Sequence, residues 1–563
     1  MVATTIGRAV ACHYSPELNI IAMASPPNMD TVEVHTARGS VSDDIKEKSE
    51  VRYSEKAGNE VIVEYEPQPK FRPADHIQSI RDAFSKQSFS TYVAVLWKFG
   101  RFIGPGTIIS VAYIDPDNFQ TAVSSGAQFQ YKLLFMVLVS NIIAVFLQSL
   151  SVKLGSVTGM DLAQMNRAHL PRWLNIGLWI MAEAAIVCTD IGQVIGTAIA
   201  INILIPRIPL VAGCALAIAD TLFILFFYKP DGSMRGLRGF ELFISAFVLA
   251  VFICFCIELS LITNTSARHV MDGFLPSREI FVSEGLYESC AILGGTLMPH
   301  TIYLGSGMAQ ARLRHFDIKH SHYREAMTSS GPQGFKLYRP SLKAIKSCLN
   351  YSIAELCITL FIVAVFVNSA ILIIAASSLS ETAQDADLFG MYALFVENIS
   401  QAAGTMFALA LLFSGISAGI VATMAGQMIA EGAMNWRIRP FYRRLLTRSI
   451  AIIPGIIVAA AEGRSGMAAA LNGCNVVLSV ALIFLTFPLI WFTTFKKYMM
   501  VETEVAESAI TIESDVERTE RNVPAVSLAN GWFTTAVGWF IWVLIAAMNI
   551  ATLTFLGLGI GGD

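Results

Sequence analysis

The chain has 563 residues, of which 54% are hydrophobic and only 15% charged, and its formal net charge is -3. So few charges over this length exclude an ordinary soluble domain, and the near-neutral balance argues against nucleic acid as a partner. Several stretches run for about 20 residues with few charges, which is enough to cross the hydrocarbon core of a membrane. The composition therefore predicts an all-α polytopic membrane protein.

The chain begins with a polar segment, residues 1–97, whose mixed charge predicts a cytosolic tail without a packed core. Eleven predicted membrane spans follow it. They are centred on residues 106–123, 133–150, 178–201, 210–227, 243–262, 289–308, 353–374, 405–429, 449–461, 475–492 and 533–556. Most of the nine cysteines fall within these spans and form no CxxC pair, so we interpret them as small buried hydrophobic residues.

The loops between the spans predict the orientation, because lysine and arginine remain on the cytosolic side. Basic residues gather after the fourth, sixth and eighth spans. They are Lys229, Arg235, Arg238, Arg312, Arg314, Lys319, Arg324, Lys336, Arg339, Lys343, Lys346, Arg437, Arg439, Arg443 and Arg444. The N-terminus is therefore predicted to be cytosolic and the C-terminus outer or lumenal. Two Asn-x-Ser sequons, at Asn264 and Asn398, fall on the outer side and predict a glycoprotein.

Two of the predicted spans are interrupted in the same way. The first carries Asp115-Pro116-Asp117-Asn118, and the sixth carries Met298-Pro299-His300 after a pair of glycines. A proline lacks the backbone N–H and clashes with the preceding turn, so both breaks must face protein or a water-filled cavity. The two spans are five apart, which gives the two halves opposite topology. Corresponding broken helices in inverted halves are typical of a secondary transporter with its site at the membrane midplane.

The side chains at the breaks indicate a cation. The half-helices before Pro116 and Pro299 end in carbonyl groups with partial negative charge. Asp115 adds a carboxylate and Asn118 an amide oxygen, while Met298 adds a thioether. A methionine in an apolar span usually serves packing, but its place beside the break proline favours a ligand role. Sulfur shifts the preference from Mg²⁺ or Ca²⁺ toward Mn²⁺, Fe²⁺, Co²⁺, Cd²⁺ or Zn²⁺.

These motifs resemble the NRAMP family of proton-coupled divalent metal transporters, and its fungal branch most. The resemblance rests on "DPDN" in the first span, "TDIGQVIG" in the third, "MPH" in the sixth and "MAGQMIAEGAMNWRIRPFYRRLLTR" after the eighth. It extends from Lys98 to Trp491. It implies a LeuT-like fold of two inverted five-helix repeats plus an eleventh helix. The implied boundaries are 98–263 and 264–495 for the repeats, 311–346 for a basic cytosolic loop, 496–530 for a second cytosolic loop and 531–563 for the last helix.

The resemblance also implies a set of site residues. One dehydrated metal ion would be bound by Asp115, Asn118, Met298, the carbonyls of Ala112 and Gly295, and the side chain of Asn475. The proton pathway would consist of His300, Glu183, Asp190 and Arg448. His300 is the only histidine in a predicted span, and an imidazole exchanges protons near neutral pH. Asp190 and Arg448 would offset the cost of each other's burial, with a static ion bridge as the alternative interpretation.

Three positions depart from the family pattern. Asp117 stands where the family has glycine, and it either faces solvent or adds to the attraction for a cation. Gln193 stands where an acid is usual and cannot carry a proton in the same way, which predicts weaker proton coupling. Asn475 stands where glutamine is usual and has a shorter reach.

The expected function is proton-coupled symport of Mn²⁺ or Fe²⁺ into the cytosol by alternating access. Co²⁺, Cd²⁺ and Zn²⁺ are further expected substrates. We expect a monomer without a tightly bound cofactor, in the plasma membrane or a vacuolar or endosomal membrane. One alternative is a sodium-coupled organic-solute carrier on the same scaffold, which the acid at Asp115 disfavours. The other is a non-transporting metal sensor, for which the tails are short. No catalytic triad, HExxH motif or P-loop indicates an enzyme.

Overall fold

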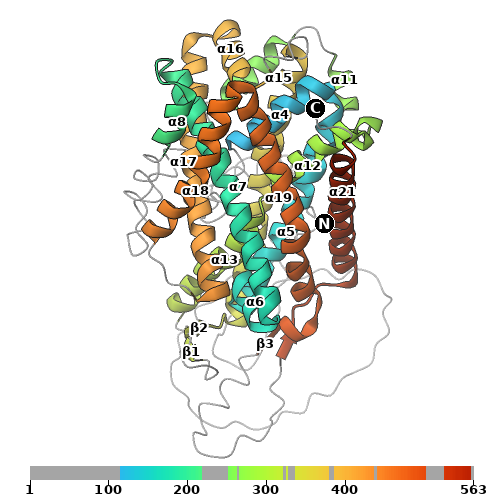
Figure 1. Cartoon of the computed structure of the whole chain (residues 1–563). Coiled ribbons are helices and arrows are strands. Elements are labelled where there is room, and N and C mark those ends of the chain that lie inside the picture. The colour runs from blue at the N-terminus through green and yellow to red at the C-terminus, as the bar shows by residue number, and fades with distance from the viewer. Residues whose placement is uncertain are drawn as a thin grey trace, which may run out of the picture. The chain divides into compact units, whose positions relative to one another are not determined.

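The computed structural model describes residues 115–217, 252–262, 266–320, 325–327, 336–379, 386–435, 440–502 and 525–559 (Figure 1). These residues are almost entirely helical. The predicted tail, residues 1–97, lies outside them, as do the first half of the first span, residues 218–227 of the fourth span and residues 243–251 of the fifth span.

The helices have the following bounds in chain order. They are α4 (Pro116–Phe129), η1 (Gln130–Leu133), α5 (Leu134–Thr158), α6 (Leu162–His169), α7 (Arg172–Leu204), α8 (Leu210–Leu216), α11 (Ala267–Asp272), η2 (Arg278–Phe281), α12 (Ser283–Leu297), α13 (Pro299–Lys319), α14 (Leu342–Thr359), η3 (Leu360–Ala364), α15 (Val365–Ser378), α16 (Leu388–Asn398), α17 (Gln401–Met434), α18 (Pro440–Ala461), α19 (Gly463–Thr494), η5 (Lys496–Tyr498) and α21 (Trp532–Gly557). A further apolar helix covers Phe252–Leu261. Strands β1 (Glu325–Met327) and β2 (Lys336–Tyr338) pair antiparallel, as do β3 (Met500–Glu502) and β4 (Ala525–Ser527).

Local capping explains several of these boundaries. α6 starts with a capping box, in which Asp161 accepts from the backbone N–H of Gln164 while the Gln164 side chain accepts from that of Asp161. α5 ends at Gly159, whose φ of 67° suits glycine. α17 starts after Ser400, whose hydroxyl accepts from the N–H of Ala403, and ends at Asn435 in the left-handed region.

Two apolar clusters form the core, and a polar layer separates them. On α7, the residues from Leu178 to Ile186 belong to one cluster and those from Val194 to Ile203 to the other. The same change occurs on α19 between Leu471 and Leu478. The buried polar residues Asp190 and Asn475 lie in the intervals between. The helices therefore place their polar positions at one level between two apolar cores.

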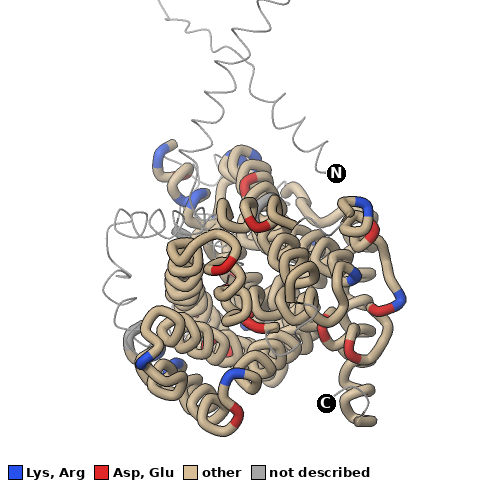
Figure 2. The backbone as a smooth tube through the Cα atoms, turned by 90° about the horizontal axis from the view of Figure 1, so that it is seen from above, with Lys and Arg blue, Asp and Glu red and all other residues tan. Residues whose placement is uncertain are grey.

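Five stretches of the described residues are long and apolar enough to cross a membrane. They are Pro116–Thr158, Arg172–Leu204, Gln401–Met434, Gly463–Thr494 and Trp532–Gly557. The predicted seventh span is continuous through α14, the π-helical turn η3 and α15. Figure 2 shows that charged positions are sparse along the backbone.

The helix that contains the predicted ninth span extends beyond the centre given for that span. α18 begins at Pro440, a residue type that favours the start of a helix, and extends for 22 residues. Arg443, which we had predicted in the cytosolic loop after span eight, therefore lies inside α18 and is 9% exposed.

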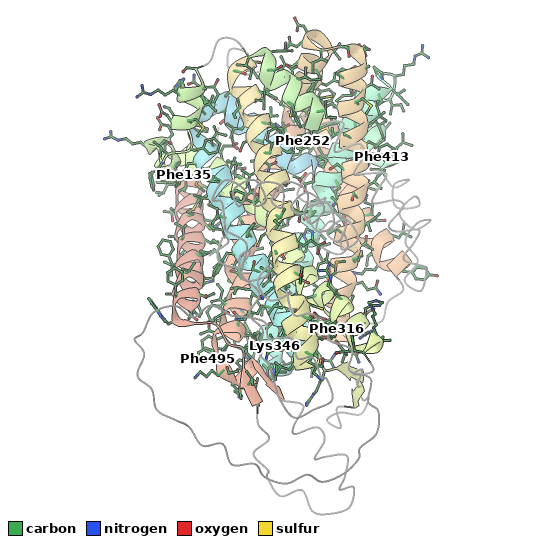
Figure 3. All side chains as sticks on the ribbon, turned by 180° about the vertical axis from the view of Figure 1, so that it is seen from behind. Phe135, Phe252, Phe316, Lys346, Phe413 and Phe495 are labelled. Carbon is green, nitrogen blue, oxygen red and sulfur yellow. The ribbon has the colours of Figure 1, made fainter. Side chains whose placement is uncertain are left out.

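The ends of several helices meet as the predicted topology requires. Figure 3 shows Phe316 of α13, Lys346 of α14 and Phe495 after α19 at one end of the helices, away from Phe135 of α5 and Phe252. The basic segment after the sixth span thus lies at the same end as the close of the tenth span.

Two helices approach closely enough to require glycine. A Cβ atom at Gly155 of α5 would lie 1.7 Å from the backbone oxygen of Ser306 of α13. Next to this contact, the Ser306 hydroxyl accepts from the N–H of Leu162 at the start of α6. α5 and α13 therefore meet backbone to backbone at this contact.

We expect Gly155→Ala to lower the thermal unfolding temperature of the purified protein, because overpacking a close contact costs about 1–3 kcal/mol or more. Gly177→Ala on α7 is the matched control, since a Cβ atom there meets nothing within 4 Å. Equal unfolding temperatures for the two variants would contradict the close approach of α5 and α13.

Candidate metal-binding site

The break in the sixth span is present, and α13 begins at its proline, while α4 begins at the proline of the first span, whose residues before Asp115 lie outside the described residues. α12 ends at Leu297, Met298 has φ 30° and ψ 97°, and α13 begins at Pro299. α4 begins at Pro116, with Asp115 as its N-cap. The first turn of a helix needs no N–H from its first residue, so both prolines occupy favourable positions.

The two carboxylate oxygens of Asp115 have different surroundings. Its Oδ1 accepts from the backbone N–H of Asn118 at 2.9 Å, which caps α4. Its Oδ2 is buried and has no hydrogen-bond partner among the residues that the structure describes. A buried carboxylate oxygen without a partner is costly, so the arrangement suits a bound cation.

Asn118, Gly295 and Asn475 meet at one point between three helices. The Asn118 Nδ2 donates to the carbonyl oxygen of Gly295 at 3.2 Å. A Cβ atom at Gly295 would lie 2.5 Å from Asn118 Oδ1 and 2.9 Å from Asn475 Nδ2. Asn475 donates through Nδ2 to the Thr121 hydroxyl at 2.9 Å, and its buried Oδ1 has no hydrogen-bond partner. Glycine at position 295 therefore lets the two amides approach the break in α12.

The site is closed to solvent in this structure. Asp115, Asn118, Met298 and Asn475 are each no more than 4% exposed. The Met298 carbonyl accepts from the N–H and hydroxyl of Thr301, which fixes the break. Ala112, the remaining predicted ligand, lies outside the described residues.

The structure brings three of the predicted proton-pathway residues together. His300 and Asp190 are both buried, and the Asp190 carboxylate interacts electrostatically with His300 and with Arg448. The Arg448 guanidinium donates to the backbone oxygen of Asp190 at 3.3 Å and to Gln193 Oε1 at 3.5 Å. Gln193 thus offers a neutral amide to the arginine.

Glu183 belongs to a separate contact. It forms an ion pair with Arg443 of α18 and accepts from Trp179 Nε1 at 3.0 Å. Sequence reasoning missed Arg443 as a partner because it placed this arginine in a loop. Pro440 three residues earlier was the signal that a helix begins before it.

Asp117 is buried, which excludes the alternative that it faces solvent. It is 2% exposed, and a Cβ atom at Gly192 of α7 would lie 2.0 Å from its Oδ1. The hydrogen-bonded thiols of Cys188 and Cys474 lie in its electrostatic surroundings. The acid in place of the family's glycine therefore packs against a glycine on the facing helix.

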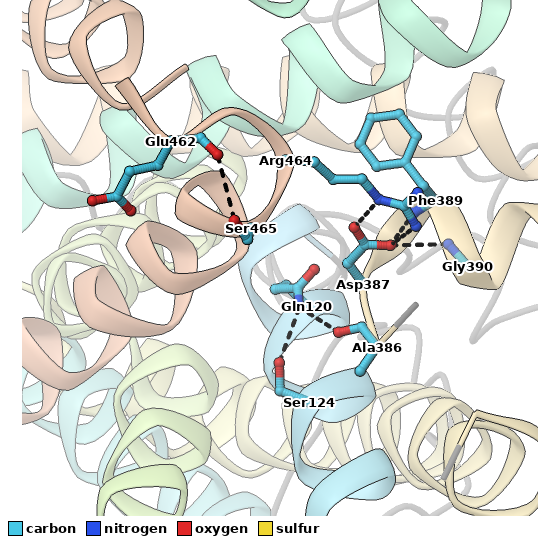
Figure 4. A network of polar contacts seen from close by, with 9 residues as sticks. All are labelled: Gln120, Ser124, Ala386, Asp387, Phe389, Gly390, Glu462, Arg464 and Ser465. Carbon is cyan, nitrogen blue, oxygen red and sulfur yellow. Dashed lines mark hydrogen bonds and ion pairs between the residues drawn. The ribbon is translucent and has the colours of Figure 1, made fainter. Parts of the chain in front are cut away.

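The N-terminal half of α4 is also tied to α16. Gln120 Nε2 donates to Ser124 Oγ at 2.9 Å and to the Ala386 carbonyl at 3.2 Å (Figure 4). The next residue, Asp387, caps α16 and forms an ion pair with Arg464 of α19. These contacts connect α4, α16 and α19 beyond the break.

Of the two predicted glycosylation sites, Asn398 is described and exposed at the end of α16. Its side-chain amide donates to Glu258 Oε2 at 3.4 Å. Asn264 lies outside the described residues.

Comparisons with known proteins show which family this chain resembles. The family model described as natural resistance-associated macrophage protein-like (Nramp) matches residues 106–507. The manganese transporter SMF1 of Saccharomyces cerevisiae is 44% identical over 499 residues, covering 82% of this chain and 87% of its own. The iron transporter SMF3 of the same yeast is 45% identical over 469 residues, covering 82% and 96%.

A solved structure supports the fold. The crystal structure of a manganese transporter from Eremococcus coleocola is similar with a TM-score of 0.64 and 27% identity, covering 81% of this chain and 87% of that one. The expected all-α, LeuT-like transporter fold is confirmed.

The contact between Asp117 and Gly192 predicts a non-additive pair of variants. Gly192→Ala should destabilise the protein by about 1–3 kcal/mol, because the new methyl group displaces the carboxylate. Adding Asp117→Gly should recover most of that loss in thermal unfolding, since it removes the displaced group. If the two effects simply added, the proposed contact would be wrong.

Proposed function

The chain belongs to the Nramp family, and from this membership we propose that it is a secondary transporter that moves Mn²⁺ or Fe²⁺ into the cytosol. Relatives that the chain covers over more than four fifths of their length are named manganese and iron transporters. The observation that carries the proposal is the convergence of Asp115, Asn118, Gly295 and Asn475 at two broken helices, with two buried oxygens that lack partners.

The metal ion would be held by ligands of mixed hardness. Asp115 Oδ2 supplies a charged oxygen and Asn475 Oδ1 a neutral one, while Met298 supplies sulfur beside the Gly295 carbonyl. Such a set accepts Mn²⁺, Fe²⁺, Co²⁺, Cd²⁺ and Zn²⁺ and penalises Ca²⁺, which prefers six to eight oxygens. In alternating access, closure of the half-helices α4 and α12 over the ion would alternate with opening toward the cytosol.

Protons would be the coupled ion. Asp190, His300 and Arg448 form a buried ionisable group on α7, α13 and α18, next to the break in α12 and α13. Buried ionisable groups in transporters mark ion and proton paths. Gln193 removes one acid from this group, and the coupling would accordingly be weaker than in relatives with an acid there. We propose that the protein is a monomer. We also propose that it lies in the plasma membrane or in a vacuolar or endosomal membrane, with its N-terminus in the cytosol.

Replacing the sulfur ligand tests the metal preference. In proteoliposomes, we expect Met298→Ala to raise the KM for Mn²⁺ about tenfold, which corresponds to about 1.4 kcal/mol. Ca²⁺ uptake should rise at the same time, because the site loses its soft ligand.

The control is Met391→Ala, which removes a methionine that is equally buried in α16. This variant should keep the wild-type preference for Mn²⁺ over Ca²⁺. Unchanged Mn²⁺ uptake in Met298→Ala, without a gain of Ca²⁺ transport, would rule out Met298 as a ligand.

A further inference from the structure

A buried acid outside the predicted proton pathway lies on the half-helix α12. Glu288 is 4% exposed, and its carboxyl group lies between α4 and α19. The Ser125 hydroxyl is 3.0 Å from Oε2, and Asn472 Nδ2 donates to Oε1 at 3.1 Å. Both partners are neutral, so neither compensates a negative charge. Burying an ionised carboxylate under these conditions is costly.

The surroundings of Glu288 contain no cation in ion-pair contact with it among the described residues. α12 packs against α4, α5, α19, α21 and η2. The titratable groups of these elements and of α12 itself are Asp117, Lys153, Cys474, Arg464, Arg278, Glu279, Glu284, Tyr287 and Cys290, while α21 has none. Of the three basic groups among them, Arg464 is paired with Asp387, Lys153 donates to Asn530 at the opposite end of α5, and Arg278 is exposed on η2.

The contact with Ser125 serves both protonation states. A hydroxyl donates to an ionised carboxylate and accepts from a protonated one. The carboxyl group can therefore gain or lose a proton without losing this hydrogen bond. Rotation of one hydroxyl is sufficient for the change.

A chain of hydrogen bonds connects Glu288 to the metal site. Asn475 Nδ2 donates to Thr121 Oγ1 at 2.9 Å, and this hydroxyl donates to Asn472 Oδ1 at 3.0 Å. Asn472 in turn donates to Glu288. Every donor points toward the carboxyl group, and such chains polarise cooperatively. The chain also holds the Asn475 amide so that its unpartnered Oδ1 remains for the metal ion.

We propose that Glu288 is a proton-binding site whose occupancy is coupled to the metal ion through Asn472, Thr121 and Asn475. This rests on the proposed function as a metal transporter. A proton on Glu288 and a divalent ion at Asn475 disfavour each other, because both are positive in a buried region. The coupling is reciprocal, so metal binding releases the proton and protonation weakens metal binding. Glu288 thus supplies a titratable group in a chain that has glutamine, which cannot titrate, at position 193 of α7.

The test counts the protons released when Mn²⁺ binds. The full-length protein is titrated with Mn²⁺ by calorimetry in two buffers with different ionisation enthalpies. We expect Glu288→Gln to bind Mn²⁺ but to release fewer protons per ion than the wild type. Glu355→Gln is the matched control, since this acid is also 4% exposed but pairs with Arg312. An equal proton count in wild type and Glu288→Gln would overturn the proposal.

Infrared difference spectroscopy provides the direct readout. The wild type should show a protonated-carboxyl stretch that Mn²⁺ reduces and that Glu288→Gln lacks. Ser125→Ala should shift this band to higher frequency, because the protonated group loses its acceptor, and this variant decides the matter if Glu288→Gln does not fold. Absence of the shift and of the Mn²⁺ effect would reject Glu288 as the site.

Flux measurements separate this proposal from the proposed function. If wild-type proteoliposomes take up no Mn²⁺, the transport proposal fails, while the infrared band still decides whether Glu288 binds a proton. If they take up Mn²⁺ with protons and Glu288→Gln leaves the flux ratio and the band unchanged, only the assignment of Glu288 fails.

Discussion

The need to satisfy polar groups inside an apolar bundle governs this structure. Lipid offers no hydrogen bonds, so an interrupted helix and its polar side chains must find partners within the protein. The two apolar clusters pack above and below the level at which α4 begins and α12 ends. The polar residues of α7, α12 and α19 gather at this level because only there do they meet one another. The candidate metal site includes two of the buried oxygens that have no hydrogen-bond partner among the described residues, Asp115 Oδ2 and Asn475 Oδ1.

Close packing at two glycines determines which polar side chains fit into the polar layer. Gly295 lets Asn118 and Asn475 reach the break, and Gly192 leaves room for the carboxylate of Asp117. In both places, a side chain larger than hydrogen would collide with a polar atom. The carboxylate of Asp117 therefore occupies space on α7 that is free because residue 192 is glycine.

The ionisable groups of the helices differ in how their charges are compensated. Glu183 is neutralised by Arg443, and the charge of Asp190 acts on both Arg448 and His300. Glu288 has only neutral partners, and a chain of side chains links it to Asn475. An acid without a counter-charge is the kind of group whose protonation responds to a nearby metal ion.

The sequence by itself determined the features that depend on local chemistry. Charge depletion predicted the membrane class, the prolines predicted both breaks, and Asp115, Asn118 and Met298 predicted the kind of cation. Only the tertiary structure decided which helices meet. Arg443 was predicted in a loop, but in the structure it is the ion-pair partner of Glu183. Asp117 is buried and packs against Gly192. Glu288 lies one residue before the predicted start of its span and was not among the predicted site residues. In the structure, α12 begins at Ser283 and Glu288 is buried. Contacts between side chains more than 100 residues apart depend on helix packing, and local periodicity carries no information about that packing.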